Sequence, residues 1–211
     1  LLCPKMLGSS ASYKILEPPR MTQKSALAAL LLLPSFSYAA TVLSAPPELN
    51  NKSYVLMDYE TGQILAAKNE NEKLAPASMT KMMTSYIIEQ KLLKGELTED
   101  EQVRMNESAW CRGSSTESCM YVPLNGTATV LEMLRGIIIQ SGNDASKAMA
   151  EHIAGNEGTF AHMMNQEAKR VGMVNTHFIN STGMPAEGHY STAKDMAVLA
   201  QHIIKDSSKY Y

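Results

Sequence analysis

The chain is 211 residues long, and 45% of its residues are hydrophobic while 19% are charged. This balance is ordinary for a globular protein, so intrinsic disorder is not the default expectation. Its 19 Lys and Arg residues nearly match its 21 Asp and Glu residues, and the formal net charge is −2. Because no basic run or basic patch of the kind that follows a phosphate backbone is present, a nucleic acid partner is not expected.

Residues 21–39 have the three parts of a secretory signal peptide, which are a short positive start, an apolar stretch and small residues at the cleavage-type positions. Pro34 interrupts the apolar stretch before it reaches the roughly 20 residues that a membrane-spanning helix needs. We therefore expect residues 1–20 to be a non-native leader upstream of the natural start, and residues 21–39 to be a signal peptide. Residues 40–211 then form the mature part.

The mature part is predicted to open with a β-hairpin that leads into a helix. Residues 53–59 and 63–67 read as two strands joined by a Glu-Thr-Gly turn. A pattern with helical period follows over residues 77–94. Pro76 suits the start of that helix, and Gly95 suits its end.

The helix over residues 77–94 is predicted to have an apolar and a polar face. At 100° per residue, an arc of about 60° holds Ser78, Lys81 and Ser85. An arc of about 140° holds the apolar side chains, which are Met79, Met82, Met83, Tyr86, Ile87 and Leu93. The pattern predicts that the apolar arc faces the core and that the polar arc forms a seam.

The rest of the chain is predicted to be mainly helical. A polar, turn-rich region over residues 97–126 precedes four helices, which are predicted over residues 129–140, 144–154, 159–171 and 192–204. A short strand is predicted at residues 174–178, ahead of a loop at Gly183-Met184-Pro185.

Three cysteines are present, and one of them, Cys3, falls in the leader. Cys111 and Cys119 are the only pair in the mature part, and in an exported chain they either form a disulfide or stay as two thiols. A metal site is not expected, because the five histidines lack HExxH or any other spacing typical of zinc ligands.

Ser78 and Lys81 stand three positions apart, so both side chains lie on the same side of a helix near its N-terminus. A serine hydroxyl is a weak nucleophile at neutral pH unless a base takes its proton as it attacks. Lysine can be that base only when it is neutral, which requires its pKa to fall from about 10.4. The helix N-terminus supplies positive potential for this shift and backbone N–H groups for a developing oxyanion.

The same spacing recurs at Ser191 and Lys194, so the motif alone is not specific. There, a structural interpretation is favoured. Ser191 or Thr192 caps the last predicted helix, and Asp195 stands in its first turn, where acidic residues are stabilising.

A second element distinguishes Ser78 from Ser191. Ser141-Gly142-Asn143 is the one Ser-x-Asn in the sequence, and it separates two predicted helices. Its glycine can serve a tight turn between helices, which is the structural interpretation. In the functional one, Ser141 relays a proton between Lys81 and a leaving amine, and Asn143 hydrogen-bonds a substrate amide.

Several ordered segments together resemble the low-molecular-mass penicillin-binding proteins, which are serine-type D-alanyl-D-alanine carboxypeptidases. The segments are residues 75–84, 135–136, 140–145, 175–178 and 188–197, and the resemblance extends over about residues 52–205. It implies an α+β fold similar to that of serine β-lactamases and DD-peptidases. In that fold an antiparallel sheet is flanked by helices, a helical subdomain is inserted, and the active site lies between them.

The resemblance also implies a chemistry. Ser78 is acylated by the penultimate D-Ala of a peptidoglycan stem peptide, Lys81 is its base, and Ser141 and Asn143 line the opposite wall. Water then hydrolyses the ester, whereas a β-lactam antibiotic acylates the same serine and leaves slowly. No cofactor and no metal are implied. The implied location is periplasmic, at the outer face of the inner membrane.

The sequence departs from the family pattern in one respect that matters for activity. The Lys-Thr-Gly motif is absent, because neither Thr61-Gly62 nor Thr182-Gly183 follows a lysine. In the family this motif binds the substrate carboxylate, and a β-rich domain and a membrane-surface helix follow it. We therefore expect residues 40–211 to be an incomplete catalytic domain, truncated before the last strands and poorly folded or weakly active alone. The full-length parent would associate with the membrane through the missing C-terminal region.

Other functions remain as alternatives. A class A-like β-lactamase would need a deacylating glutamate after the Ser-x-Asn element, and Glu157, Glu167 and Glu187 stand in unsuitable sequence surroundings. A glutaminase of related fold would share only the Ser-x-x-Lys motif. A non-catalytic penicillin-sensing or wall-binding module would keep the nucleophile without turnover.

Overall fold

The structure is a computed structural model that describes residues 45–46, 48–113 and 116–211. The expected leader, the expected signal peptide at residues 21–39 and Cys3 lie outside the described residues. Residues 46–211 form one unit by their contacts, and the description below concerns this unit. In the part of the chain that is described, no helix combines the length and the apolar character needed to cross a membrane.

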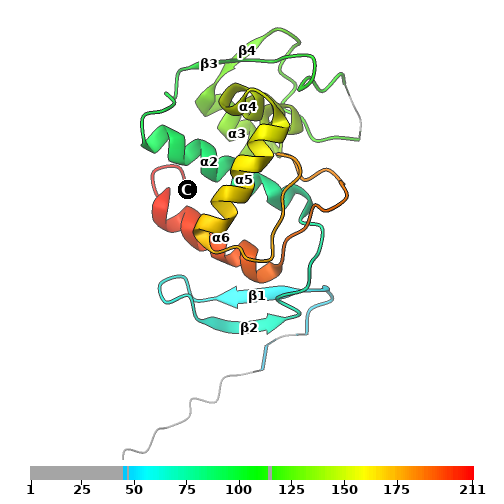
Figure 1. Ribbon diagram of the computed structural model, residues 1–211, viewed down its shortest axis with the longest axis vertical. Coiled ribbons are helices and arrows are strands. Elements are labelled where there is room, and N and C mark those ends of the chain that lie inside the picture. Colours follow the sequence, from blue (N-terminus) through cyan, green and yellow to red (C-terminus); the bar gives the residue numbers. More distant parts are fainter. Residues whose placement is uncertain (1–44, 47, 114–115) are drawn as a thin grey trace, which may run out of the picture. The chain divides into compact units, whose positions relative to one another are not determined.

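The predicted hairpin is confirmed. Strands β1 (Tyr54–Met57) and β2 (Ile64–Lys68) pair antiparallel, with the register shifted between Leu56 and Met57. The Asp58 carboxylate accepts hydrogen bonds from the Thr61 N–H and hydroxyl at 2.8 and 2.6 Å, which fixes the turn. β1 also contacts the last helix, α6 (Ala193–Asp206), so that the hairpin lies against the helical part (Figure 1).

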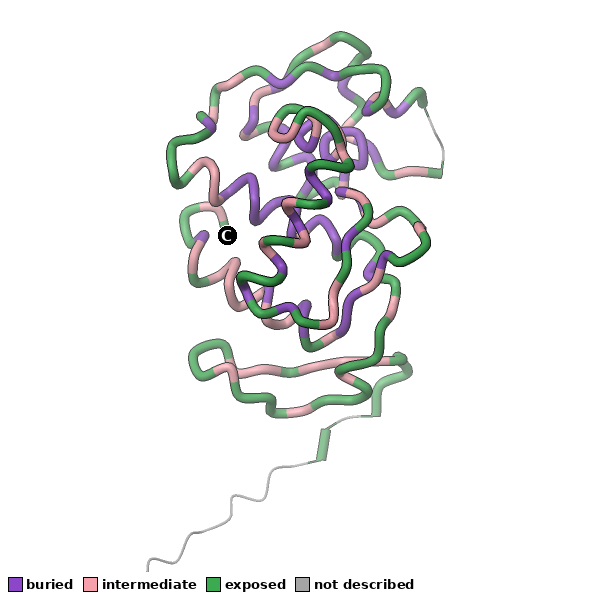
Figure 2. The backbone as a smooth tube through the Cα atoms, in the orientation of Figure 1, coloured by how far each residue is buried: buried purple, intermediate pink, exposed green. Residues whose placement is uncertain are grey.

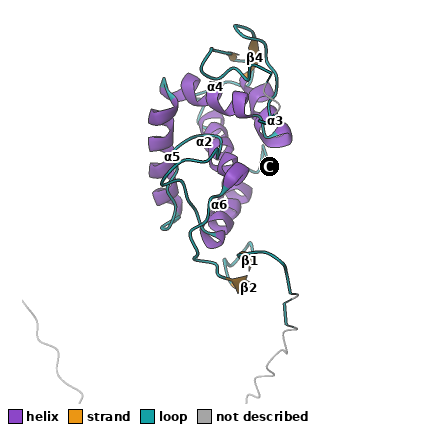
Figure 3. Cartoon of the chain, turned by 90° about the vertical axis from the view of Figure 1, so that its right-hand side faces the viewer, coloured by secondary structure: helices purple, strands orange, loops and turns teal. Residues whose placement is uncertain are grey.

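Helix α2 (Lys81–Leu93) organises the unit, because it contacts each of the four helices that follow it in the chain. Two hydrophobic clusters flank it. Ile88 belongs to the cluster around α3 (Val130–Gln140) and α4 (Asn143–Ala154). Met83 and Tyr86 belong to the cluster that also takes in α5 (Glu157–Val171) and α6. α2 is therefore buried on more than one side (Figure 2), and helices supply most of the regular structure (Figure 3).

The predicted core face of α2 is confirmed in its middle and wrong at its ends. Met83, Tyr86 and Ile87 are buried, whereas Met79 is 49% exposed and Leu93 is 45% exposed. Met79 lies in a 3-10 turn, Ala77–Thr80, that precedes α2, so the 100° spacing of an α-helix does not apply to it. Leu93 is the last residue of the helix, where the neighbouring helices no longer cover it.

The four predicted helices after residue 126 are confirmed as α3 to α6. Thr129 caps α3 in a capping box, in which its side chain accepts from the Glu132 N–H and the Glu132 side chain accepts from the Thr129 N–H. The structure also decides between the two candidate caps of α6. The Thr192 hydroxyl accepts from the Asp195 N–H at 3.1 Å, so Thr192 is the cap.

Two short strands were not predicted, and one predicted strand is wrong. β3 (Gln102–Arg104) and β4 (Thr127–Thr129) pair antiparallel, but three residues are too few to give a readable alternation. The strand predicted at residues 174–178 is reduced to an isolated bridge between His177 and Tyr190. Val174 is 81% exposed, and within residues 174–178 Phe178 is the buried one, so the segment lacks the alternating buried positions of a strand.

The structure joins Cys111 and Cys119 in a disulfide whose Cα atoms are 6.3 Å apart, which decides between the two states left open by the sequence. Closing a loop of this length is expected to stabilise the fold by about 2.5 kcal/mol in the chain-entropy treatment. We predict that the double variant Cys111→Ser/Cys119→Ser loses about this much free energy of unfolding in urea titration. Addition of reductant should destabilise the parent chain equally and leave the variant unchanged. Equal stability of parent and variant would contradict the prediction.

Candidate active site

Ser78 lies in a constrained turn at the start of α2. Pro76 precedes the 3-10 turn Ala77–Thr80, and Ala77 has a φ of +48°, in the left-handed region that L-residues avoid. This conformation costs about 1–2 kcal/mol, so tertiary contacts must hold it in place. The turn leaves Ser78 exposed to solvent three residues ahead of α2, close to the helix N-terminus, where the first N–H groups of an α-helix lack intrahelical partners.

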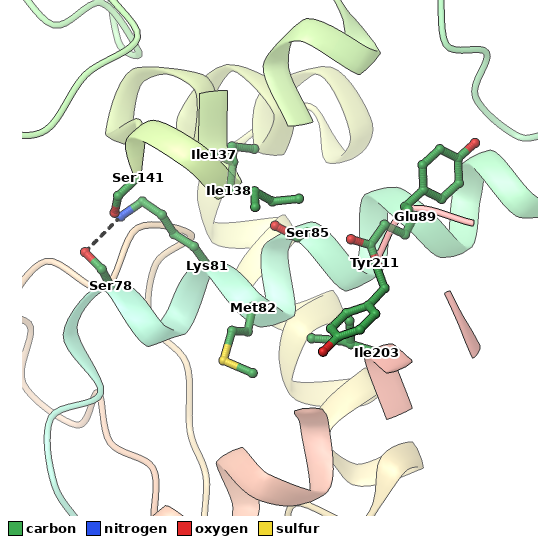
Figure 4. A pocket seen from close by; sticks show the side chains of 11 residues that line it. Ser78, Lys81, Met82, Ser85, Glu89, Ile137, Ile138, Ser141, Ile203 and Tyr211 are labelled. Atoms are coloured by element: carbon green, nitrogen blue, oxygen red, sulfur yellow. Dashed lines mark hydrogen bonds between the residues drawn. The ribbon is translucent and has the colours of Figure 1, made fainter. Parts of the chain in front are cut away.

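Lys81 is buried beside that serine. Its side chain sits one turn along the helix, and the residue is only 4% exposed. The Lys81 Nζ atom is 3.4 Å from the Ser78 Oγ atom and donates a 2.7 Å hydrogen bond to the Thr182 carbonyl oxygen. The amine is therefore held in one direction by a backbone group and lies within reach of the hydroxyl (Figure 4).

The surroundings of Lys81 favour its neutral form. Burial lowers the pKa of Lys81 from its ordinary value of 10.5 to about 8. The negative charge of Glu117 raises this pKa, and the positive charge of Lys147 lowers it, so the two partly offset one another. At pH 7 roughly one tenth of the molecules then carry a neutral amine, which is far more than an exposed lysine would give.

A pocket of about 430 Å³ runs from Ser78 along α2. Its polar lining includes Ser78 from the 3-10 turn and three side chains from one face of α2, which are Lys81, Ser85 and Glu89. Its other lining residues are Met82, Ile137, Ile138, Ser141, Ile203, Tyr210 and Tyr211. The predicted polar seam of α2 thus faces a pocket, and Glu89 extends it by one turn.

Ser141 reaches the pocket from the end of α3. It has a φ of +56° and ends the helix, which turns its side chain out of the helical path. Figure 4 shows the Ser141 hydroxyl directed toward the amine of Lys81, on the side away from α2. The structure therefore brings Ser78, Lys81 and Ser141 together.

Asn143 is the one predicted site residue that does not line this pocket. It begins α4, is 5% exposed, and its backbone N–H donates to the Ser118 carbonyl oxygen at 2.8 Å. Its Nδ2 atom donates to the Glu117 Oε2 atom at 3.1 Å. Glu117 also faces Lys147 at 3.8 Å, so a small charged cluster borders the site at the start of α4.

Two residues near the site escaped sequence reasoning. Thr182 acts on Lys81 through its backbone carbonyl, which leaves no side-chain signature in the sequence. Glu117 lies between Cys111 and Cys119 in the chain, and only its hydrogen bond with Asn143 reveals its contact with the site.

The loop that carries Thr182 packs directly on the turn that carries Ser78. Gly183 has a φ of +85°, and a Cβ atom built on it would lie 1.8 Å from the Ala77 carbonyl oxygen. The Thr80 hydroxyl bonds the His189 Nε2 atom at 2.9 Å, and the Thr84 hydroxyl donates to the Ser181 carbonyl at 2.7 Å. The loop thus fixes the turn that carries Ser78 from one side.

We predict that Gly183→Ala lowers the free energy of unfolding by at least about 2 kcal/mol, because a backbone atom must move to admit the methyl group. Gly188→Ala is the matched control, since Gly188 has a similar φ of +79° but its nearest neighbours lie 3.9 and 4.0 Å from a built Cβ atom. Urea titration should show a larger loss for Gly183→Ala. Equal losses would mean that φ alone, and not the contact with Ala77, requires glycine.

Among the described residues, no group of three His, Cys, Asp or Glu side chains is placed to hold a metal ion. The groups that this pocket offers to a ligand are hydroxyls, one amine and the Glu89 carboxyl. Burial raises the pKa of Glu89, and its Oε2 atom has no hydrogen-bond partner within the described part of the chain.

A family model described as D-alanyl-D-alanine carboxypeptidase matches residues 40–211, and the chain belongs to this family of serine peptidases. D-alanyl-D-alanine carboxypeptidase DacA of Haemophilus influenzae is 40% identical over 195 residues, which cover 91% of this chain and 50% of that protein. DacF of Bacillus subtilis, which carries the same description, is 48% identical over 157 residues, covering 74% of this chain and 40% of that one.

The crystal structure of penicillin-binding protein 5 from Haemophilus influenzae matches with a TM-score of 0.78 and 41% identity, over 80% of this chain and 49% of that chain. These matches confirm the resemblance and the expected α+β DD-peptidase-like fold. The chain spans about half the length of the relatives it matches.

Proposed function

We propose that this chain carries the nucleophile and the base of a serine-type D-alanyl-D-alanine carboxypeptidase. The substrate is a peptidoglycan stem peptide, from which the enzyme removes the terminal D-Ala. The observation that supports this most is the pairing of Ser78 with a buried amine, 3.4 Å away, whose pKa is lowered to about 8. A solvated lysine beside a capping serine would have neither property.

In the proposed acylation step, the Ser78 oxygen attacks the carbonyl carbon of the penultimate D-Ala while neutral Lys81 takes the hydroxyl proton. Backbone N–H groups at the start of α2 stabilise the oxyanion. The peptide bond then breaks, and the proton passes through Ser141 to the nitrogen of the departing D-Ala. Water attacks the resulting ester while Lys81 accepts a proton from it, and Lys81 returns that proton to the Ser78 oxygen as the ester bond breaks and the trimmed stem is released.

Asn143 has a binding role in this proposal. Its Nδ2 atom donates to Glu117, and its carboxamide oxygen is the acceptor that we assign to a substrate N–H. A β-lactam presents a strained amide to the same serine and is expected to form a long-lived ester with it. Nucleophile, base and relay are all side chains, so no cofactor enters a step.

The family membership implies a bacterial cell-wall enzyme that is exported. We further propose that residues 21–39 direct export to the periplasm, and that residues 40–211 supply one part of the catalytic domain. The longer parent would work at the outer face of the inner membrane and associate with it through a later region. Nucleic acid has no part in this proposal. Trimming of stem peptides limits the sites available for cross-linking and so influences cell shape.

The test is release of free D-alanine from a synthetic stem pentapeptide, measured by chiral chromatography with near-stoichiometric amounts of the chain. We expect release from a peptide ending in D-Ala-D-Ala, none from the matched peptide ending in D-Ala-L-Ala, and inhibition by benzylpenicillin. Rapid nitrocefin hydrolysis would instead indicate the class A-like β-lactamase. A stable penicillin adduct without any D-alanine release would indicate a penicillin-sensing or wall-binding module.

A further inference from the structure

We infer that Glu157 is a positioning residue for the lysine base, acting through the backbone of the loop at residues 180–183. The inference rests on the acyl-transfer function proposed above. Glu157 stands in the first turn of α5 and has no place in the mechanism as described so far.

The Glu157 carboxylate holds Ser181 at two points. Its Oε1 atom accepts from the Ser181 backbone N–H at 3.0 Å and from the Ser181 hydroxyl at 2.6 Å. Ser181 is fully buried, so both donors would be left unsatisfied in the interior without this carboxylate. Hydrogen bonds to an ionised acceptor are about twice as strong as those between neutral groups.

The other face of the same loop touches α2. The Ser181 carbonyl accepts from the Thr84 hydroxyl at 2.7 Å, and the next carbonyl, that of Thr182, accepts from Lys81 Nζ at 2.7 Å. The loop is thus hydrogen-bonded to α5 on one side, and on the other side its Thr182 carbonyl accepts from the Lys81 amine. Ser181, which is hydrogen-bonded to Glu157, directly precedes Thr182, whose carbonyl orients the Lys81 amine.

Asn180 makes the loop rigid enough to transmit this restraint. Its Oδ1 atom accepts from the N–H groups of Thr182 and Gly183 at 3.2 and 2.7 Å, and its Nδ2 atom donates to the Met184 carbonyl at 2.9 Å. Gly183 in turn packs against the Ala77 carbonyl. A displacement at Ser181 therefore reaches both Lys81 and the turn that carries Ser78.

Glu157 acts by hydrogen bonding and not by its charge on the amine. The charged groups that shift the pKa of Lys81 are Glu117 and Lys147, and burial is the largest cause. Glu89 enters the same pocket from α2, and His189 touches the neighbouring Thr80. If the loop loosens, water gains access to the amine and the effect of burial weakens. The pKa of Lys81 should then rise toward that of an exposed lysine.

The experiment follows the titration of Lys81 by NMR in protein labelled at the lysine side chains, with the Lys81 signal assigned by its absence in Lys81→Met. This measurement needs no substrate, so it decides the role of Glu157 even if the chain releases no D-alanine. We expect Glu157→Ala to raise the titration midpoint by about one pH unit, and to slow penicillin acylation at pH 7 about tenfold. Glu157→Gln, which keeps an oxygen acceptor for Ser181, should restore most of both properties.

Glu187→Ala is the matched control, because Glu187 is an exposed glutamate near the same loop. It should leave the midpoint unchanged. Ser181→Ala removes only the hydroxyl bond and should produce a smaller shift in the same direction, which keeps the test decisive if Glu157→Ala fails to fold. An unchanged midpoint in Glu157→Ala, or in Ser181→Ala if that is the variant that folds, would overturn the inference. Equal shifts in Glu157→Ala and Glu157→Gln would overturn it too, since they would assign the effect to charge.

Discussion

Replacing Ser78 with alanine is expected to abolish covalent labelling of the chain by benzylpenicillin. The hydroxyl oxygen is the atom that forms the ester, and no neighbouring group can replace it, so the acylation rate should fall by more than about 10³-fold. Ser78 is exposed, and its removal should change the free energy of unfolding by no more than about 0.5 kcal/mol. Intact-protein mass spectrometry after prolonged incubation measures the adduct, and peptide mapping locates it.

Ser191→Ala provides the matched control, because Ser191 begins the second Ser-x-x-Lys in the sequence. Ser191 is 2% exposed, and its hydroxyl lies 2.8 Å from that of Thr176. This variant should be labelled like the parent. An adduct that persists in Ser78→Ala and maps to Ser191 would reverse the assignment of the nucleophile.

Replacing Lys81 with methionine should slow penicillin acylation by about 10²- to 10⁴-fold, which is the usual contribution of a positioned general base. Methionine has a similar length and fills the buried space without an amine. In the parent chain, raising the pH removes the proton from Lys81, and only the neutral amine can accept the proton of Ser78. Acylation should therefore rise with pH and reach half of its plateau near pH 8, where burial places the pKa of Lys81.

Lys81→Met should also change how the free energy of unfolding depends on pH. The folded-state pKa of Lys81 is lowered from 10.5 to about 8, so the stability linked to its neutral form is present above about pH 10.5 and is lost as the pH falls through 8. In Lys81→Met this dependence should disappear. Lys194→Met, at the exposed lysine of the second motif, should keep both the acylation profile and the pH dependence of the parent. A parent chain whose acylation rate is flat between pH 6 and pH 9 would contradict the role of Lys81.

Local patterns predicted the elements of the fold well where the elements are long. The hairpin and the helices from α2 to α6 could be located because their apolar spacing and their caps, such as Thr129 and Thr192, lie within one segment each. β3 and β4 could not, because each has three residues and their pairing joins positions far apart in the chain, such as Val103 and Ala128. Contacts of that kind leave no periodic trace.

The residues of the candidate site likewise fall into those that local sequence spacing predicts and those that only tertiary contacts reveal. The Ser78 and Lys81 pair and the turn at Ser141 could be proposed from spacing, because helix geometry fixes which side chains meet. The Thr182 carbonyl could not, because any residue type has one. The contact of Asn143 with Glu117 depends on how a segment near the disulfide folds over α4, which only the three-dimensional structure shows.

Because α2 contributes Ile88 to one hydrophobic cluster and Met83 and Tyr86 to the other, the alignment of Ser78 with Lys81 depends on both clusters at once. Loosening either cluster would free α2, which carries Lys81 and follows directly on the turn that carries Ser78. A molecule that is acylated by a β-lactam is therefore expected to have both hydrophobic clusters natively packed. The fraction of acylated molecules would then measure the fraction that is natively packed. It could be used to compare destabilising variants far from the site.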